Sequence, residues 1–226
     1  MKVGRVFRRG NLFLTSAFYG LIAIVISFVV GALFYYVLKE DTRQNKRKQI
    51  EEVGSQIINF IMYIWIGKII LKNPPFIKDP MAVLPYPSDS KAFYFATICI
   101  FIHIYLKFRN KQEEKFQLLQ TFLPIFIVSQ FTYEFMQIVF FEMKPNWLLL
   151  IFYACLIFLY MILNNKLSER KIQLTILTFL LMGNSLLAIF TRTYVFGYPL
   201  HAIYFVLMFI WMLAFIIINN KRLVQQ

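Results

Sequence analysis

Charge is the scarcest property of this sequence. Only 15% of its 226 residues are charged, and these residues come in short clusters between long uncharged runs. Soluble domains carry about 25% charged residues, so the composition excludes an ordinary soluble protein. Several of the uncharged runs reach the length of about 20 apolar residues that a helix needs to cross a bilayer. We therefore expect an all-α, polytopic transmembrane bundle that forms a single integral membrane domain over residues 1–226.

Cysteine and histidine are nearly absent as well. Cys99 and Cys155 lie inside apolar runs without a CxxC spacing, and His103 and His201 stand alone. Clustered cysteines and histidines are the usual signature of metal and redox sites. The sequence therefore predicts no metal site and no cofactor, and packing or interface roles for the two histidines.

Acidic residues are also few. There are 11 of them against 24 lysines and arginines, which gives a formal net charge of +13. In a soluble protein this imbalance indicates nucleic-acid binding. Here the basic residues lie in the short segments between apolar runs, where such residues set the topology and contact anionic head groups. We therefore expect membrane phospholipid as a partner and no nucleic acid.

Seven apolar segments have the composition of spanning helices. They cover about residues 13–38, 53–71, 92–106, 117–141, 147–163, 172–190 and 200–218. Residues 73–91, between the second and third segments, contain five prolines. Because each proline removes a backbone donor, this stretch is expected to be a long structured loop or a re-entrant segment. Pro124 is expected to interrupt the fourth helix.

The distribution of lysine and arginine predicts the orientation. Fourteen basic residues fall on one side of the bundle and nine on the other, with Lys68 excluded because it lies inside the second helix. The positive-inside rule then places the C-terminus in the cytoplasm, and the N-terminus and loop 73–91 outside. The basic start precedes an apolar run too long for a signal peptide, so we expect a retained first helix. The basic residues before it are expected to form a surface helix on the outer leaflet.

Polar residues inside the apolar segments are candidates for a functional site, because such residues are costly in a membrane. Gln130, Glu134 and Gln137 are spaced i, i+4, i+7, which places them on one face of the fourth helix. Tyr133 adds a hydroxyl beside Glu134. This pattern is typical of a pocket for a head group or a proton. The alternatives are hydrogen bonding between helices, or a Glu134 that lies near the membrane interface.

Two basic residues near predicted helix ends are further candidates. Lys68 could place a cation at the outer head-group level and bind a phosphate, or it could be a snorkelling lysine of the kind common near helix ends. Arg192 follows the sixth predicted helix, where it would be a head-group anchor, a phosphate ligand, or both.

Several stretches, taken in order, resemble the motifs of one enzyme family. FYGL at residues 18–21 resembles an RWYGL opening. MYIWIGKIILKNPP at 62–75 resembles a GARLGYV segment and its proline-containing loop, with Lys68 in place of an arginine. LTFLLMGNSLLAIFTR at 177–192 resembles a YGxxRFxxExxR helix. These are motifs of the prolipoprotein diacylglyceryl transferase family, to which the chain is similar over most of its length.

The resemblance implies a fold, a location and an activity. Members of that family have seven helices with the N-terminus outside and the C-terminus inside, which implies a multi-pass protein of the bacterial plasma membrane. They transfer diacylglyceryl from phosphatidylglycerol to a lipobox cysteine. A phospholipid pocket is therefore expected here, and its candidate lining residues are Tyr19, Lys68, Gln130, Glu134, Gln137 and Arg192.

The residues that carry the family's chemistry are missing. The expected outward loop lacks the family's histidine and has Ser90 or Lys91 near its place, while Gln130 falls where the GRxGN motif has arginine. Ser185 and Ile189 replace an arginine and a glutamate. No catalytic residue is assigned, and whether the chain is an enzyme stays open. We expect a phospholipid-binding protein on a transferase-like scaffold. The alternative is a non-enzymatic membrane subunit or assembly partner of an envelope or transport complex.

Overall fold

The structure is a computed structural model that describes residues 3–71, 90–109, 111–141, 146–164 and 166–224. Within these ranges, the side chains of residues 3–19, 141 and 214–224 are not described. The predicted loop 73–91 lies almost entirely outside the described residues, which resume at Ser90 with the start of a helix.

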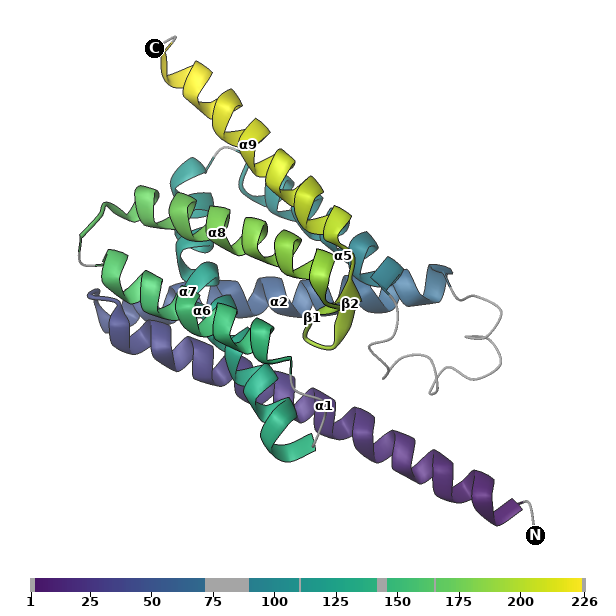
Figure 1. The fold of residues 1–226 in the computed structure, drawn as a ribbon. Helices are drawn as coiled ribbons and strands as arrows, with labels where there is room; N and C mark the ends of the chain where they lie inside the picture. The colour runs from purple at the N-terminus through teal and green to yellow at the C-terminus, as the bar shows by residue number, and fades with distance from the viewer. Residues whose placement is uncertain (1–2, 72–89, 110, 142–145, 165, 225–226) are drawn as a thin grey trace. The chain divides into compact units, whose positions relative to one another are not determined.

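Seven helices and one small hairpin make up the described chain (Figure 1). They are α1 (Val3–Leu38), α2 (Arg43–Leu71), α5 (Ser90–Lys107), α6 (Gln112–Phe141), α7 (Trp147–Asn164), α8 (Glu169–Phe190), β1 (Thr193–Val195), β2 (Tyr198–Leu200) and α9 (Ala202–Val224). The predicted all-α class is confirmed. Five of these helices are long and apolar enough to cross a membrane, namely α1 from Gly20 onward, α2, α6, α7 and α8. The architecture is that of a multi-pass integral membrane protein.

Several helices extend beyond the apolar runs that predicted them. α2 begins at Arg43 rather than at residue 53, because its polar first turns consist mainly of arginine, lysine, glutamine and glutamate, which are good helix formers. α1 is helical from Val3, so the basic start of the chain is part of this helix and not a separate surface helix. α6 continues through Pro124. Helices in membranes tolerate the loss of a single backbone donor at proline.

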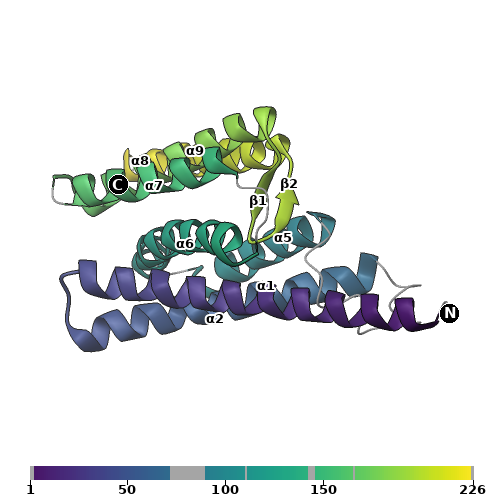
Figure 2. The same cartoon turned by 60° about the horizontal axis from the view of Figure 1, so that its bottom comes forward.

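The chain divides into two compact units. The first comprises Met1–Pro145 with Phe196–Tyr198, and the second comprises Asn146–Val195 with Pro199–Gln226. In the first unit, α1 packs along α6 and α2 packs along α5; in the second, α8 packs against both α7 and α9 (Figure 2).

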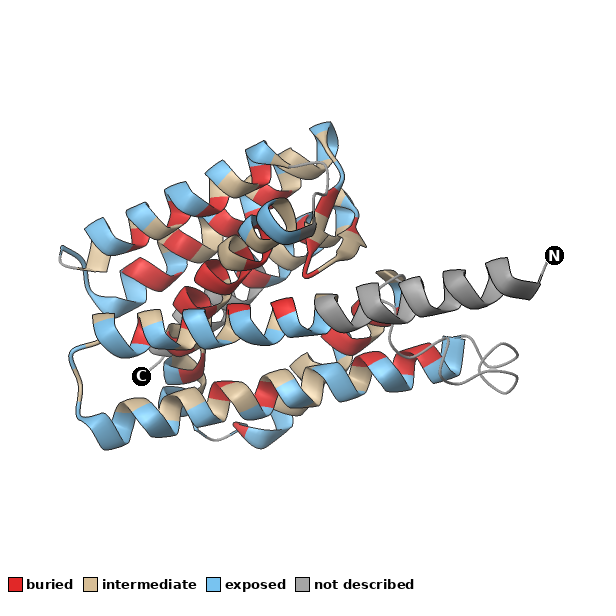
Figure 3. Cartoon of the chain, turned by 90° about the horizontal axis from the view of Figure 1, so that it is seen from below, coloured by how far each residue is buried: buried red, intermediate tan, exposed pale blue. Residues whose placement is uncertain are grey.

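A row of buried residues along α1 faces α6. Ala23, Ser27, Gly31 and Tyr35 recur every four residues and are buried, as the red bands along this helix show (Figure 3). A Cβ atom added at Gly31 would collide with the Ser129 hydroxyl and with the backbone carbonyl of α6. Small residues allow such close approach of two helix backbones in membranes. The sequence of α1 therefore specifies its contact with α6.

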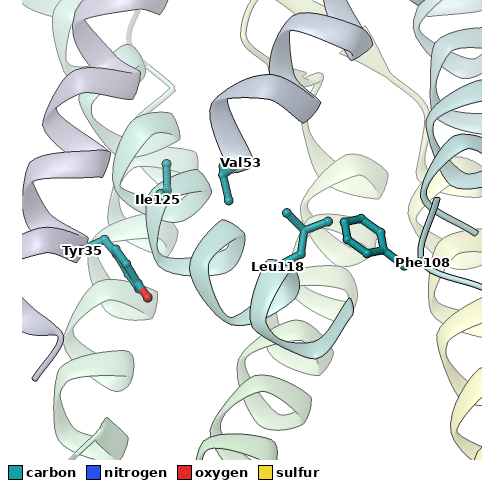
Figure 4. Packing of buried hydrophobic residues seen from close by; sticks show 5 residues of the cluster. All are labelled: Tyr35, Val53, Phe108, Leu118 and Ile125. Carbon is teal, nitrogen blue, oxygen red and sulfur yellow. The ribbon is translucent and has the colours of Figure 1, made fainter. Parts of the chain in front are cut away.

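The apolar core of the first unit lies toward the end of α1 and the start of α6. Tyr35, Val53, Phe108, Leu118 and Ile125 form a buried cluster (Figure 4). The Tyr35 hydroxyl donates a hydrogen bond to Gln49 on α2 and accepts one from Thr121 on α6 at 3.2 Å. These two bonds, together with the apolar contacts, link α1, α2 and α6.

A buried polar contact joins two helices of the second unit. The Tyr153 hydroxyl on α7 donates to Asn184 Oδ1 on α8 at 3.3 Å, and the Asn184 amide donates to the carbonyl of Leu180 at 2.8 Å. Near this contact, a Cβ atom at Gly183 would collide with the ring of Phe152. Glycine at that position therefore lets α7 and α8 approach closely.

Candidate functional site

The predicted polar residues of α6 form a hydrogen-bonded group in the interior of the first unit. Gln130 is fully buried and Glu134 is 9% exposed. The Gln130 Nε2 atom donates to Glu134 Oε1 at 3.0 Å. Gln137 lies one turn further along α6, and the neighbouring Tyr133 is buried. The i, i+4 spacing in the sequence thus corresponds to a real contact between side chains.

A tight turn contributes to the same interior. β1 and β2 are joined by the two residues Phe196 and Gly197, which have φ angles of 47° and 82°. Two-residue hairpin turns with positive φ at both positions match the twist of the strands. Glycine adopts this conformation freely, whereas a phenylalanine in it is a true outlier. Such strained residues persist where surrounding contacts hold them in place.

Contacts from α1 and α6 hold Phe196 in this conformation. Its backbone N–H donates to Gln130 Oε1 at 3.2 Å. Its ring centroid lies 4.9 Å from that of Phe28, 5.6 Å from that of Tyr133 and 5.9 Å from that of Phe126. We call these three side chains the aromatic cage. Phe196 is 9% exposed, so the turn is docked inside the first unit and does not project into the surroundings.

Gln130 connects the turn to the acid. Its amide oxygen accepts from Phe196 and its amide nitrogen donates to Glu134, so both ends of the side chain are engaged. One of these bonds lies within α6 and the other joins α6 to the hairpin turn, whereas the alternative interpretation expected hydrogen bonds between helices. Glu134 differs, because only its Oε1 atom is bonded by a side chain of the described chain.

The chemical capacity of the site follows from Glu134. The described residues contain no ion pair to its carboxylate and no cluster of three or more metal-ligating side chains. A buried carboxylate is costly unless it is protonated or paired. The second oxygen can therefore accept a proton or a hydrogen-bond donor carried by a ligand. Nucleophilic or general-base chemistry on a bound lipid would need further groups, and α6 carries no histidine.

The other predicted site residues are not all brought to this group. Lys68 lies on the buried side of α2 at 2% exposure and interacts with another group of the protein, whereas a snorkelling lysine would be exposed. Arg192 is exposed and belongs to the second unit, where its backbone carbonyl accepts from Asn146 at 3.4 Å. Tyr19 lies in the part of α1 whose side chains are not described.

Sequence reasoning missed two features of the first unit. One is the docked turn, for which the only signal is a Phe–Gly pair between short β-favouring segments. The other is a polar cluster between α2 and α5. There Glu52 Oε1 accepts from Lys107 at 2.6 Å and from Gln56 at 2.7 Å, and Tyr63 bonds His103 at 3.0 Å. His103 is thus hydrogen-bonded.

Comparison with protein-family models, with characterised proteins and with solved structures finds no match to this chain.

Proposed function

We propose that this multi-pass membrane protein binds a phospholipid head group at Glu134, on a scaffold similar to that of the diacylglyceryl transferases, without catalysing diacylglyceryl transfer. The single observation behind the proposal is the state of the Glu134 carboxylate. It is buried in a helix long and apolar enough to span the membrane, and the described residues satisfy one of its two oxygens.

A cationic donor is the ligand that this geometry favours. A carboxylate in an apolar setting is stabilised by a hydrogen-bonded ammonium group, which supplies both charge and a donor. Among common head groups, phosphatidylethanolamine carries such a group, whereas phosphatidylcholine has a cation without an N–H donor. Tyr133 and Gln137 lie on the same helix and carry polar atoms for the rest of the head group.

Binding without transfer fits the composition of the site. Transfer needs a group that removes the proton of the acceptor thiol and cations that stabilise the departing phosphate. The α6 group consists of amides, a phenol and a carboxylate, and Gln130 is occupied by structural hydrogen bonds.

Native mass spectrometry of the purified chain tests the proposal. The chain is titrated with phosphatidylethanolamine and, separately, with phosphatidylcholine, and Glu134→Gln is compared with Glu113→Gln on an exposed position of the same helix. We expect preferential binding of phosphatidylethanolamine that Glu134→Gln weakens about tenfold, which corresponds to about 1.4 kcal/mol. The control should bind like the unmodified chain.

Two results would contradict the proposal. Equal binding by Glu134→Gln and the unmodified chain would show that the carboxylate is not a ligand for the head group. A stoichiometric protein partner that co-purifies in mild detergent, with no retained lipid, would instead support the role of a membrane subunit.

A further inference from the structure

An open hollow in the surface, called the cavity below, lies where α1 ends and α2 begins, far along the chain from Glu134. It has a volume of about 440 Å³. Its lining residues are Tyr36, Arg43, Gln44, Arg47, Ile50 and Glu51. Pockets for small ligands start at about 300 Å³, so the space is sufficient for a lipid head group. The charge count predicts that this connection faces the cytoplasm.

Arginine dominates the charge of this cavity. Arg43 and Arg47 are one helical turn apart on α2, and both are exposed. Arg47 pairs with Glu51 at 2.7 Å, whereas Arg43 has no hydrogen-bond or ion-pair partner in the part of the chain that the structure describes. The lining therefore carries one net positive charge, presented by a guanidinium group that is free to bind an anion.

The neighbouring Lys46 stabilises the wall of the cavity through contacts within the protein. Lys46 Nζ donates to the carbonyls of Tyr36 at 2.9 Å and Lys39 at 3.1 Å, and it lies 4.5 Å from the centre of the Tyr36 ring. These contacts cap the C-terminal end of α1 and hold Tyr36 against the cavity. The positions of α1 and α2 around the cavity are thus fixed by the protein itself.

Apolar side chains lead away from the cavity along α1. Leu33 is 58% exposed and Val37 is 82% exposed, and they continue an exposed row that includes Val25 and Val29 at the same four-residue spacing. This row belongs to a helix that is long and apolar enough to span the membrane. A ligand that satisfies both features has an anionic head and a hydrocarbon tail.

We infer that the cavity binds the phosphodiester of an anionic membrane phospholipid. Arg43 donates from its planar fork to two phosphate oxygens, the geometry for which arginine is better suited than lysine. Arg47 adds positive charge beside the pair, and the amide of Gln44 donates to a hydroxyl of the head group. The acyl chains lie along Leu33 and Val37. This site takes a phosphate, whereas the proposed Glu134 site takes an ammonium group.

The test uses the full chain in a neutral detergent, titrated with phosphatidylglycerol or phosphatidylcholine and followed by native mass spectrometry. Arg43→Gln/Arg47→Gln is compared with Lys48→Gln/Arg109→Gln, which removes the same charge from exposed positions outside the cavity. We expect the first double variant to lose phosphatidylglycerol binding at least tenfold. The matched control should lose less than twofold. Equal losses of phosphatidylglycerol binding in the two double variants would show that binding depends only on general surface charge, and would contradict a specific site at Arg43.

Three further measurements test the chemistry of the ligand and the independence of the two sites. Soluble glycerophosphate should not displace the lipid at equal concentration; displacement would assign the site to a free phosphate compound. Glu134→Gln should leave phosphatidylglycerol binding unchanged, so this inference and the proposed function fail independently. If the double variant unfolds, Arg43→Lys keeps the charge and removes the fork. It should weaken phosphatidylglycerol binding severalfold, and unchanged binding would contradict the assigned geometry.

Discussion

The side-chain oxygen of Gln130 accepts the backbone N–H of Phe196 at 3.2 Å, although 66 positions separate the two residues in the sequence. The same side chain donates to Glu134 at 3.0 Å. The strained turn between β1 and β2 and the buried acid of α6 are therefore parts of one hydrogen-bonded network, with Gln130 at its centre.

Gln130→Leu should destabilise the first unit. The substitution keeps most of the volume but leaves the buried N–H of Phe196 without its acceptor, which costs about 1–3 kcal/mol. A lower midpoint of thermal unfolding in detergent would show this loss. Gln112→Leu, at an exposed position near the start of α6, is the control and should change the midpoint little. Equal midpoints for the two variants would contradict the role given to Gln130.

Two effects on stability oppose each other at Phe196 in the docked turn, namely backbone strain and the packing of its ring. Phe196→Gly removes the strain of the left-handed conformation, worth about 1–2 kcal/mol, but also removes a ring packed in the aromatic cage, worth about 3–5 kcal/mol. We expect a net loss of stability. At Gly197, with φ 82°, Gly197→Ala adds strain alone and should also destabilise. The midpoint of thermal unfolding, measured for both variants, tests these expectations. A higher midpoint for Phe196→Gly than for the unmodified chain would show that packing in the aromatic cage stabilises the protein by less than the backbone strain destabilises it.

Two glycines in adjacent helices form a matched pair for testing helix contact. A Cβ atom at Gly31 would meet α6, whereas nothing lies within 4 Å of one at Gly54 on α2. Gly31→Ala should therefore separate α1 from α6 and lower the unfolding midpoint. Gly54→Ala should raise stability by up to about 1 kcal/mol, because alanine favours the helix. Stabilisation of equal size by both substitutions would argue against close packing at Gly31.

Cysteine labelling tests the predicted orientation. With Cys99 and Cys155 replaced by serine, a cysteine at Ser88 should react with a membrane-impermeant maleimide in intact cells. A cysteine at Thr42 should react only after the cells are permeabilised. Labelling of Ser88→Cys from the cytoplasmic side would reverse the orientation.

No transfer of diacylglyceryl is expected from the purified protein when it is incubated with phosphatidylglycerol and a lipobox peptide. The chain lacks the histidine and most of the arginines of the diacylglyceryl transferase motifs that parts of it resemble. Lys91 lies near the place of that histidine, but it is exposed in the first turn of α5 and belongs to no buried polar group of α6. Product formation that survives Lys91→Ala would show that a different set of residues performs the reaction.

The helices could be predicted because a helix that crosses a bilayer needs a continuous apolar run of sufficient length, which is visible in the sequence. Their ends could not, since the polar first turns of α2 favour helix as strongly as its apolar part does. The contact of Gln130 with Glu134 followed from a spacing within one helix, which is a local property.

The rest of the site depends on partners that are distant in the sequence. Phe196 is identifiable as a docked residue only when Phe28 and Gln130 are known to lie beside it. Hydropathy likewise predicts that Lys68 is inside a helix, but it does not report which neighbours cover the side chain. Both features arise from tertiary packing, which a periodic pattern in one segment does not encode.

The docking of Phe196 also determines when the first unit can complete its packing during synthesis. The ribosome delivers the chain from its N-terminus, so α1, α2, α5 and α6 exist before the turn that fills their aromatic cage has been made. During that interval Gln130 lacks its backbone partner, and the cage is open. The first unit is completed only after α7 and α8 have been synthesised, because Phe196–Tyr198 belong to it. A nascent chain that ends before residue 196 therefore lacks the side chain that fills the aromatic cage.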